Sequence, residues 1–269
     1  MRRLAAVLAL LAAAGLCHGA AQSPGFAAYE KANALFTAKK FPECLAQIEE
    51  ALRLDPKLVA ALTLKAKLAM ILNRFDMSRE SLEQALAADP TSAYAQFLYG
   101  LDAYLRSDLQ AALPRLEKAR QLNLADPRSA LYLGLTHESL GQPSEALKLY
   151  EEAVRLEQSA GAPQADTFLT GSRLLLLMGR LDDCDLWIKR ALKLEPNSRA
   201  AHFEFGRLLE RRGDPLQAAR EGESALRLPD GDPADAQIHY LLIRAYQECG
   251  QPAQAARHAE ALRAIENTK

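Results

Sequence analysis

The sequence predicts an all-α protein in which pairs of helices stack into a linear array. The first observation is a period of 34 residues that begins near residue 25 and continues to the end of the chain. The second is the spacing of apolar residues, which recur every three or four positions within each half of the period. The third is the glycine and proline that separate the halves. A period of about 20–50 residues is typical of arrays whose units bury their apolar faces only against neighbouring units.

The period divides most of the chain into seven units, which we number as repeats 1 to 7. Their expected bounds are 25–58, 59–92, 93–126, 127–164, 165–198, 199–235 and 236–269. Four extra residues precede repeat 5, and three precede repeat 7. Glycine and proline lie in both insertions, so we expect surface loops there that leave the stack intact. The acidic second loop lacks the ligand spacing of a calcium site, and no metal is expected in it.

Three columns of the period hold small residues in nearly every repeat. The eighth column contains Ala32, Ala66, Gly100, Gly134, Ser172 and Gly206, with Ile243 as the exception. The twentieth contains Cys44, Ser78, Ala112, Ala146, Cys184, Ala218 and Ala255. The twenty-seventh contains Ala51, Ala85, Ala119, Ala153, Ala191 and Ala225, followed by Leu262. Small side chains indicate close helix crossings, because a larger side chain there would push the two helices apart.

Each repeat is expected to contain a helix A, a tight turn and a helix B. In repeat 4, helix A is expected over 129–140 and helix B over 143–156. A left-handed residue is needed where helix A ends, and glycine adopts that conformation readily. The residues at this position are Lys39, Asn73, Ser107, Gly141, Gly179, Gly213 and Gly250. Proline opens several B helices, where its missing N–H costs nothing.

The pattern of repeat 4 resembles the tetratricopeptide repeat family. The residues that carry the resemblance are Leu133-Gly134 in helix A and Ala146, Tyr150 and Ala153 in helix B. A closing proline follows helix B in other repeats, whereas the family's early helix A tryptophan is replaced throughout. The resemblance covers residues 25–269 and implies a right-handed α-solenoid of about seven helix-turn-helix repeats.

Residues 1–21 are typical of a secretory signal peptide. Arg2 and Arg3 form a positive start, and 4–16 is an apolar stretch shorter than the roughly 20 residues of a membrane-spanning helix. Small residues at Gly19 and Ala21 then fit cleavage before Gln22. The sequence therefore predicts a secreted or periplasmic protein with no membrane span after cleavage.

Two other interpretations of this segment stay open. It could remain as an anchor helix, or Cys17 could be the acylated residue of a lipoprotein. Bulky Leu16 directly before Cys17 fits a lipoprotein signal poorly, so the cleaved signal peptide is preferred.

The charge and the cysteines narrow the class of protein. The formal net charge is −1, and removal of residues 1–21 with two Arg leaves 31 basic and 34 acidic residues, a net charge of −3. A nucleic-acid binder needs a basic stripe, so an RNA-reading helical repeat is disfavoured. Cys44 and Cys184 lie four repeats apart in a packing column, which argues against a disulfide between them. Cys249 is expected to be the most exposed thiol.

Catalysis finds little support in the sequence. The histidines outside the leader are His137, His202, His239 and His258, and no two have the spacing of a metal-binding helix. Nucleophile, phosphate-binding and dinucleotide motifs are missing. We therefore expect no catalytic residues, no metal site and no cofactor.

A partner-binding surface is what the family resemblance implies. In resembling proteins the A helices line a concave groove that holds a peptide or a protein partner. The expected groove residues are Tyr29, Asn33, Lys67, Tyr94, Phe97, Leu101, Tyr104, Leu131, Tyr132, Leu135, Arg173 and Arg207. Such a surface is aromatic at its centre and mixed in charge toward the C-terminus. For any one aromatic residue, packing between adjacent A helices is the alternative.

The function expected from these features is that of a non-enzymatic scaffold for protein–protein interaction, in the cell envelope. The alternatives are a subunit of an envelope enzyme or secretion complex, and a self-associating structural repeat. In the last repeat, no following unit is expected to cover Leu262 and Ile265, which would also allow a homodimer.

Overall fold

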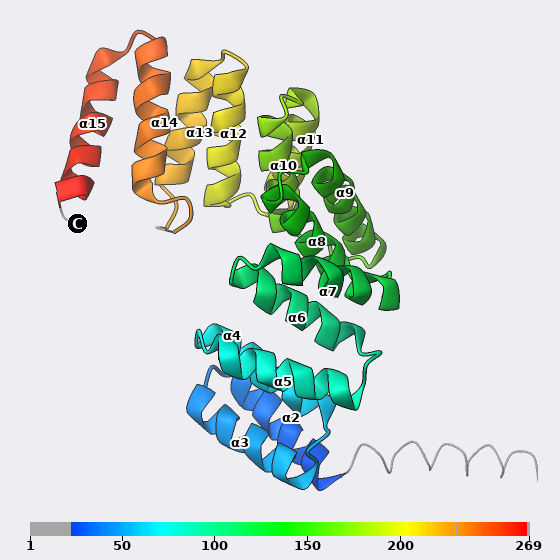
Figure 1. The fold of residues 1–269 in the computed structure, drawn as a ribbon. Helices are drawn as coiled ribbons and strands as arrows, with labels where there is room; N and C mark the ends of the chain where they lie inside the picture. The colour runs from blue at the N-terminus through cyan, green and yellow to red at the C-terminus, as the bar shows by residue number, and fades with distance from the viewer. Residues whose placement is uncertain (1–22, 230, 268–269) are drawn as a thin grey trace, which may run out of the picture. The chain divides into compact units, whose positions relative to one another are not determined.

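The computed structural model describes residues 23–229 and 231–267. The signal peptide expected over 1–21 lies outside the described residues. The described ranges contain fourteen α-helices joined in helix-turn-helix pairs (Figure 1), which confirms the all-α repeat architecture. Contacts divide the chain into two compact units, Met1–Ala125 and Asp126–Lys269. Each unit is described separately below.

The first unit contains three helix pairs, one for each of repeats 1 to 3. The helices are α2 (Pro24–Thr37), α3 (Phe41–Leu54), α4 (Val59–Ile71), α5 (Phe75–Ala88), α6 (Ala93–Leu105) and α7 (Leu109–Leu122). Each pair packs against itself, and helix B of one repeat packs against helix A of the next.

The second unit contains four helix pairs with the same arrangement. The helices are α8 (Pro127–Ser139), α9 (Pro143–Ser159), α10 (Ala165–Leu177), α11 (Leu181–Leu194), α12 (Arg199–Arg211), α13 (Pro215–Leu226), α14 (Asp235–Glu248) and α15 (Pro252–Asn267). A continuous apolar core runs through α9, α10, α11 and α12.

Repeat 4 differs from expectation at both of its helix ends. Helix α8 begins at Pro127, two residues before the expected start, because the Asp126 carboxylate accepts a hydrogen bond from the Arg128 amide and caps the helix. Helix α9 continues through the first inserted residues to Ser159, and Gly161 with φ of 70° follows its end. Most of the insertion therefore lengthens a helix.

The turns between the helices of each pair adopt the left-handed conformation that the sequence predicts. φ is positive at the three non-glycine residues Lys39, Asn73 and Ser107, as it is at the corresponding glycines. In repeat 4 the Gly141 amide donates to Glu138 O and the Gln142 amide to His137 O, both at 2.9 Å. These bonds satisfy the last carbonyls of helix A.

The small columns lie where the helices cross most closely, as predicted. A Cβ added at Gly100 would come within 2.6 Å of the Leu116 side chain, and one at Gly134 within 2.6 Å of the Tyr150 ring. Tyr150 itself is completely buried and donates a hydrogen bond from its hydroxyl to Glu138. Glycine at these two positions is therefore required by the size of the helix B side chain that packs against it.

In repeat 5 the glycine at the close helix crossing is Gly171, one position before the eighth column. A Cβ on Gly171 would lie 2.0 Å from the Trp187 ring, so this tryptophan packs directly on the backbone of α10. Trp187 also meets Phe168 edge to face, with ring centroids 5.8 Å apart. The only tryptophan in the chain is thus accommodated by a glycine outside the small columns.

Each insertion is held by one buried charged side chain. Glu157, near the end of α9, accepts hydrogen bonds from the Gln164 amide at 3.1 Å and the Thr167 hydroxyl at 2.7 Å. Arg199, at the start of α12, donates to the carbonyl oxygens of Leu228 and Pro233 and pairs with the Asp235 carboxylate. These contacts fix the start of the following helix A in the second unit.

Within the described ranges the cysteines are free thiols, and two of them, Cys44 and Cys184, are buried at helix crossings. Burial raises the pKa of the Cys184 thiol to about 12, so this residue stays protonated and unreactive. Cys249 is half-buried.

The last helix covers more of its apolar surface than the sequence suggests. Leu262 turns toward α14 and is only 7% exposed, whereas we expected it to lie uncovered. The reason is that α15 packs against α14, its partner in the last helix pair. Ile265, on the same helix as Leu262, is half-buried. No helix in the described ranges is long and apolar enough to cross a membrane.

Candidate functional site

The A helices of the first unit present a surface of half-buried aromatic and apolar side chains. Tyr29 on α2 is half-buried, and Asn33 on the same helix is exposed. On α4, Lys67 is half-buried, with its ammonium nitrogen 4.7 Å from the centre of the Phe36 ring. A cation over an aromatic face is held in place electrostatically. Of these expected residues, Lys67 contacts helix α2 through the Phe36 ring.

Helix α6 contributes most of the aromatic residues, and the structure separates them into two groups. Tyr94, Leu101 and Tyr104 are half-buried and reach the surface. Phe97 is only 3% exposed and lies beneath Tyr94, with the two rings stacked 6.4 Å apart. Phe97 therefore supports the surface from below, which is the packing alternative that the sequence left open for each aromatic residue.

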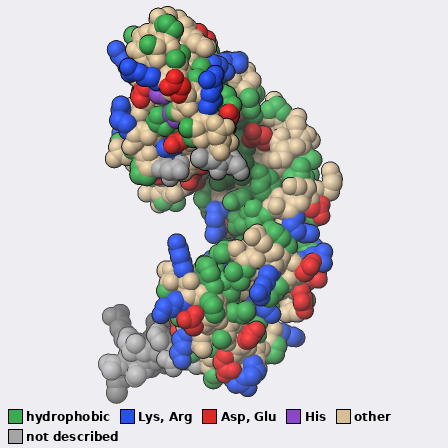
Figure 2. Space-filling view, turned by 90° about the vertical axis from the view of Figure 1, so that its left-hand side faces the viewer, with side chains coloured by type: hydrophobic (Ala, Val, Ile, Leu, Met, Phe, Trp, Pro, Cys, Tyr) green, Lys and Arg blue, Asp and Glu red, His purple; other side chains and the backbone are tan. Residues whose placement is uncertain are grey.

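Two tyrosines from repeats 1 and 3 lie near each other. Burial raises the pKa of the Tyr29 hydroxyl, and the nearby Tyr94 hydroxyl raises it further. Phe26 contacts the Tyr29 ring at a centroid distance of 5.4 Å. Phe26, Tyr29, Tyr94, Leu101 and Tyr104 are called the aromatic surface below. Figure 2 shows one face of the molecule, on which hydrophobic side chains gather between charged ones.

In the second unit, the expected residues on α8 are anchored in the core. Leu131, Tyr132 and Leu135 are half-buried. Leu131 and Leu135 pack against the apolar core of this unit, which leaves part of each side chain at the surface. They form a smaller apolar patch on the first A helix of the second unit.

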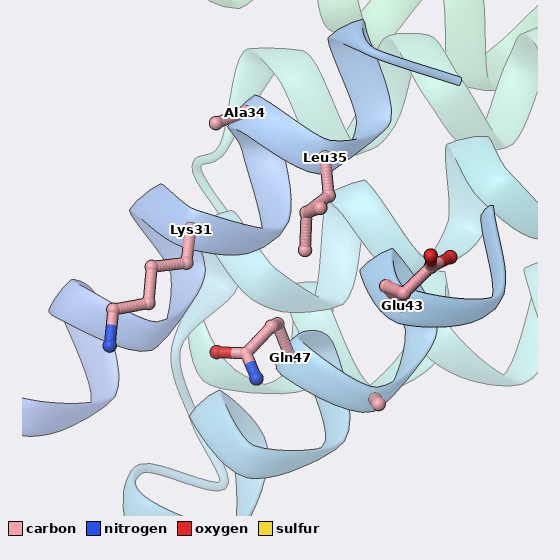
Figure 3. A pocket seen from close by; sticks show the side chains of 6 residues that line it. Lys31, Ala34, Leu35, Glu43 and Gln47 are labelled. Atoms are coloured by element: carbon pink, nitrogen blue, oxygen red, sulfur yellow. The ribbon is translucent and has the colours of Figure 1, made fainter. Parts of the chain in front are cut away.

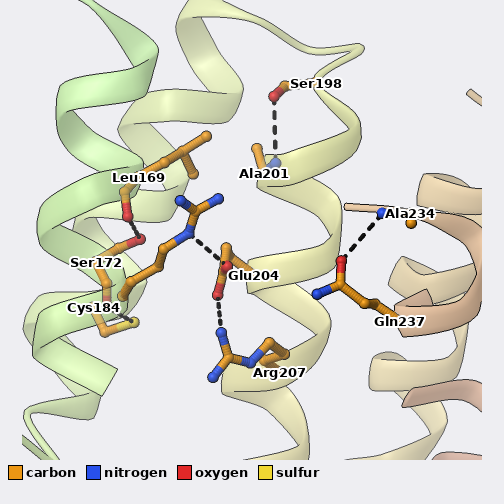
Figure 4. A network of polar contacts seen from close by, with 10 residues as sticks. Leu169, Ser172, Cys184, Ser198, Ala201, Glu204, Arg207, Ala234 and Gln237 are labelled. Atoms are coloured by element: carbon orange, nitrogen blue, oxygen red, sulfur yellow. Dashed lines mark hydrogen bonds and ion pairs between the residues drawn. The ribbon is translucent and has the colours of Figure 1, made fainter. Parts of the chain in front are cut away.

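Arg173 and Arg207 meet through a buried acid that sequence reasoning missed. Arg173 on α10 donates from Nε to Glu204 Oε1 at 2.8 Å, and Arg207 on α12 donates from Nη1 to Glu204 Oε2 at 2.9 Å (Figure 4). Glu204 is 3% exposed. Its position three residues before Arg207, an ion-pair spacing on a helix, was the available signal.

A second ion pair continues this series in the next repeat. Arg244 on α14 donates from Nη2 to Glu210 Oε2 on α12 at 2.7 Å. Burial raises the pKa of the Glu210 carboxyl, and the positive Arg244 opposes that rise. Three successive A helices of the second unit therefore carry an arginine in the ninth column: Arg173, Arg207 and Arg244.

Two of the histidines, His239 on α14 and His258 on α15, lie together and link the last three helices of the second unit. His239 Nδ1 lies 3.0 Å from His258 Nδ1, and His258 Nε2 lies 3.1 Å from Glu223 Oε1. Tyr246 donates its hydroxyl to the same carboxylate at 3.1 Å. Burial and the neighbouring His258 lower the pKa of His239. This cluster holds α15 in place, and its groups are engaged with one another.

A shallow pocket of about 580 Å³ lies between α2 and α3 (Figure 3). Its lining is Lys31, Ala34, Leu35, Glu43, Ala46 and Gln47. In repeat 3 the corresponding face is covered, since Tyr99 donates a hydrogen bond to Glu83 of the preceding helix B. The pocket therefore lies on the outer face of the first repeat.

Across residues 23–229 and 231–267, no three His, Cys, Asp or Glu side chains converge on a point that could hold a metal ion. The geometry of the described A helices, with half-buried rings in one unit and paired arginines in the other, suits recognition of a polypeptide.

Family comparison agrees with the fold. The tetratricopeptide repeat profile matches residues 29–93, 63–113, 97–163 and 186–236, which together cover more than half of the chain. The chain belongs to the tetratricopeptide repeat family. Proteins of this family typically mediate protein–protein interactions. A comparison with curated proteins found no match.

Several solved structures share the fold at low sequence identity. In the APC/C hetero-tetramer Cut9-Hcn1, one chain matches with a TM-score of 0.61 and 14% identity over 93% of this chain. This chain spans only 48% of that one. Pseudomonas aeruginosa pilF matches with a TM-score of 0.55 and 17% identity, covering 91% of this chain and 93% of its own. YrrB, described as a tetratricopeptide repeat protein with an unusual peptide-binding site, matches at 0.50 and 19% identity, with coverage of 67% and 91%.

Proposed function

We propose that this protein is a non-enzymatic scaffold that binds a peptide or a segment of a partner protein on its A helices. The observation that carries the proposal is the aromatic surface of the first unit, where Tyr29, Tyr94, Leu101 and Tyr104 are each partly exposed. Half-buried rings are held firmly by the fold and still offer contact area. They therefore lose little conformational freedom when a partner binds.

The chemistry of this surface fits an extended or helical polypeptide. Tyrosine offers an apolar ring together with a hydroxyl that can donate and accept hydrogen bonds, which suits apolar anchors next to a peptide backbone. The peptide-binding site named for YrrB supports this use of the fold, although that protein's partner is not carried over to this chain.

We further propose that the scaffold acts in the cell envelope or outside the cell. The support is the sequence of residues 1–21, with its two arginines, its apolar stretch and its small residues before Gln22. Sequencing the N-terminus of the protein isolated from its own cells tests this proposal. A mature chain that starts at Gln22 is expected, and an uncleaved Met1 or an acylated Cys17 would contradict it.

The binding proposal is tested by crosslinking and pull-down from the envelope fraction. The full chain, expressed with its own leader, is compared with a triple variant carrying Tyr94→Ser, Leu101→Ser and Tyr104→Ser. Phe97 is left unchanged because it is buried. A matched control carries Leu54→Ser and Leu124→Ser, which remove exposed apolar side chains of the first unit outside its A helices.

Circular dichroism first establishes that all three proteins keep their helix content. A partner captured by the wild type and the control but lost by the triple variant is expected. Equal capture by all three would place the binding surface elsewhere and contradict the proposal for the first unit.

A further inference from the structure

We infer that Arg173 and Arg207 form a binding site for carboxylate side chains of an acidic partner segment. This inference rests on the proposed scaffold function and adds the chemistry of the partner. It concerns the second unit alone, on the A helices α10 and α12.

The two arginines are built into one rigid pair. Each guanidinium donates to a different oxygen of Glu204, at 2.8 Å and 2.9 Å, so both oxygens of this carboxylate are engaged. Glu204 is buried, and an acid in that position is held firmly by the surrounding core. Charge-assisted bonds to a fixed carboxylate orient both guanidinium planes before any partner arrives.

The pair keeps donors for an additional ligand. Arg173 uses its Nε, and Arg207 uses Nη1, so among the described residues the other guanidinium N–H groups of both are left for outside acceptors. The side chains are 41% and 34% exposed, whereas that of Glu204 is 4% exposed. A ligand approaching this surface therefore meets donors, and the acid lies behind them.

The charge balance favours a singly charged anion. Two arginines and one glutamate leave a local charge of +1, which a single carboxylate would reduce to zero. The planar fork of a guanidinium matches a carboxylate with two parallel hydrogen bonds. A doubly charged phosphate would leave an excess negative charge close to buried Glu204.

The neighbouring repeat extends this site in a way that suits a polypeptide chain. Arg244 occupies the same column on α14, and its side chain is 61% exposed while it holds Glu210. An aromatic ring lies one turn before each of these two arginines, Phe203 before Arg207 and Tyr240 before Arg244. The Arg207 guanidinium lies 5.9 Å from the Phe203 ring centre. An aromatic residue and an arginine thus occur together on both α12 and α14. This arrangement suits a partner segment in which acidic residues alternate with other residues.

A purely structural role for the network would be to brace α10 against α12. A brace predicts no affinity for acids and a loss of stability in either arginine variant. The carboxylate site predicts binding that depends on both arginines and falls with salt, because the pair is partly exposed. The two explanations therefore differ in a measurement of binding.

The test uses the full chain and a fluorescent, acetylated and amidated peptide in which glutamate alternates with glycine. A matched peptide has glutamine in place of glutamate, and a third is the glutamine peptide with a free terminal carboxylate. Fluorescence anisotropy is measured for the wild type, Arg173→Gln, Arg207→Gln and the control Arg220→Gln. Arg220 is exposed on the B helix α13, so the control loses the same charge away from the pair.

Binding of the glutamate peptide but not of its glutamine counterpart is expected. Each variant of the pair should weaken it roughly tenfold, the usual scale for losing one charge-assisted contact, while Arg220→Gln leaves it within about twofold. Equal binding of the two amidated peptides, or equal loss in the control, would overturn the inference. Preference for the free terminal carboxylate would show that the site reads a chain end and would overturn the assignment to side chains.

If either variant loses helix content, the inference is tested on the wild-type protein alone. The Nε–Hε resonances of its arginines are followed by NMR during titration with the glutamate peptide. Shifts at Arg173 and Arg207 are expected, and their absence at saturating peptide would overturn the inference. Capture of a partner through the aromatic surface without any acid preference would leave the proposed function standing and remove only this site.

Discussion

At the scale of single residues, stability depends on side chains that leave no space for a substituent. Gly134 faces Tyr150, and the aromatic ring lies where a Cβ would be. Gly171 stands in the same relation to Trp187. Interiors packed at this density respond to a single added methyl group. At Gly134 and Gly171, the size of the facing aromatic side chain therefore requires a residue without a Cβ.

Gly134→Ala is expected to lower the free energy of unfolding by about 1–3 kcal/mol, because its Cβ would overlap the fully buried Tyr150 ring. Urea unfolding followed by circular dichroism measures the change. Gly231→Ala serves as a control, since a Cβ there has open space around it. Equal stability of the two variants would refute the close crossing of α8 and α9.

The structural role of Arg199 cannot be predicted from the neighbouring sequence. Its guanidinium donates to carbonyl oxygens of the second insertion and pairs with Asp235. Arg199→Met should destabilise the second unit by about 3 kcal/mol, since buried acceptors lose their donor. Thermal unfolding checks this, with the exposed Arg220→Met as the matched control. A melting temperature equal to that of the control would contradict the assigned role.

At the scale of elements, each helix pair depends on a left-handed residue in its turn. Repeats 4 to 7 use glycine, whereas the first three repeats place Lys39, Asn73 and Ser107 in this conformation. At Lys39 and Ser107 this conformation brings the Cβ close to the following carbonyl oxygen, at a cost of about 1–2 kcal/mol, whereas asparagine adopts it more readily. The first unit thus contains strain in its turns that the second unit lacks.

Ser107→Gly is expected to stabilise the protein by about 0.5–1 kcal/mol, because the relief of strain exceeds the extra flexibility of glycine in the unfolded chain. Gly141→Ser should show the opposite sign, since its φ is 73° with no neighbour within reach of a Cβ. Urea midpoints measure both. Changes of the same sign in the two variants would contradict this account.

The last helix is expected to loosen in acid. The pKa of His239 is lowered in the folded state, so the unfolded state binds more protons just below the ordinary pKa of about 6.5. Stability from this group is therefore present above that pH and is lost as the pH falls. Besides His258, the charged groups near His239 are Asp235, Glu223 and Arg199, and the two acids oppose the shift.

Hydrogen exchange of α15 between about pH 7.5 and 5.5, corrected for intrinsic rates, tests this expectation. A local readout is needed because the pKa of His202 is raised by its hydrogen bond to Glu221, and this group gains stability as the pH falls. His239→Gln should flatten the pH dependence at α15. Unchanged protection of α15 in the wild type at both pH values would disprove it.

At the scale of the whole molecule, contacts are local along the chain. Within each unit, helices contact their partner in the pair and the nearest helices of the adjacent repeat. Such arrays are stabilised by the sum of repeats and the interfaces between neighbours. Residues of one column then recur on successive A helices, as the arginines of α10, α12 and α14 do.

A chain that ends at residue 229 should therefore keep α2 to α13 folded. Its helical signal is expected to fall in proportion to the two lost helices, α14 and α15, with a lower melting temperature because part of the α12 and α13 surface becomes exposed. Circular dichroism measures both quantities. Loss of most helical signal would show cooperativity beyond nearest neighbours.

Much of this architecture was determined by the sequence alone. The helix pairs, the left-handed turns and the close crossings follow from local and periodic features, because neighbours along one chain decide them. The tetratricopeptide resemblance and the tyrosines of α6 as surface residues were also accessible in this way. The helix boundaries were harder to predict from the sequence. In repeat 4 the Asp126 cap starts α8 earlier than expected, and the inserted residues extend the end of α9.

Only the tertiary structure decided which residues of the A helices are available to a partner. Phe97 and Tyr94 belong to the same helical pattern, yet one ring is buried beneath the other. Glu204 joins Arg173 to Arg207 although Arg173 lies 31 residues before it, and Trp187 requires a glycine on the facing helix. Exposure and ion pairing depend on side chains from different helices, whose distances and relative sizes no single period encodes.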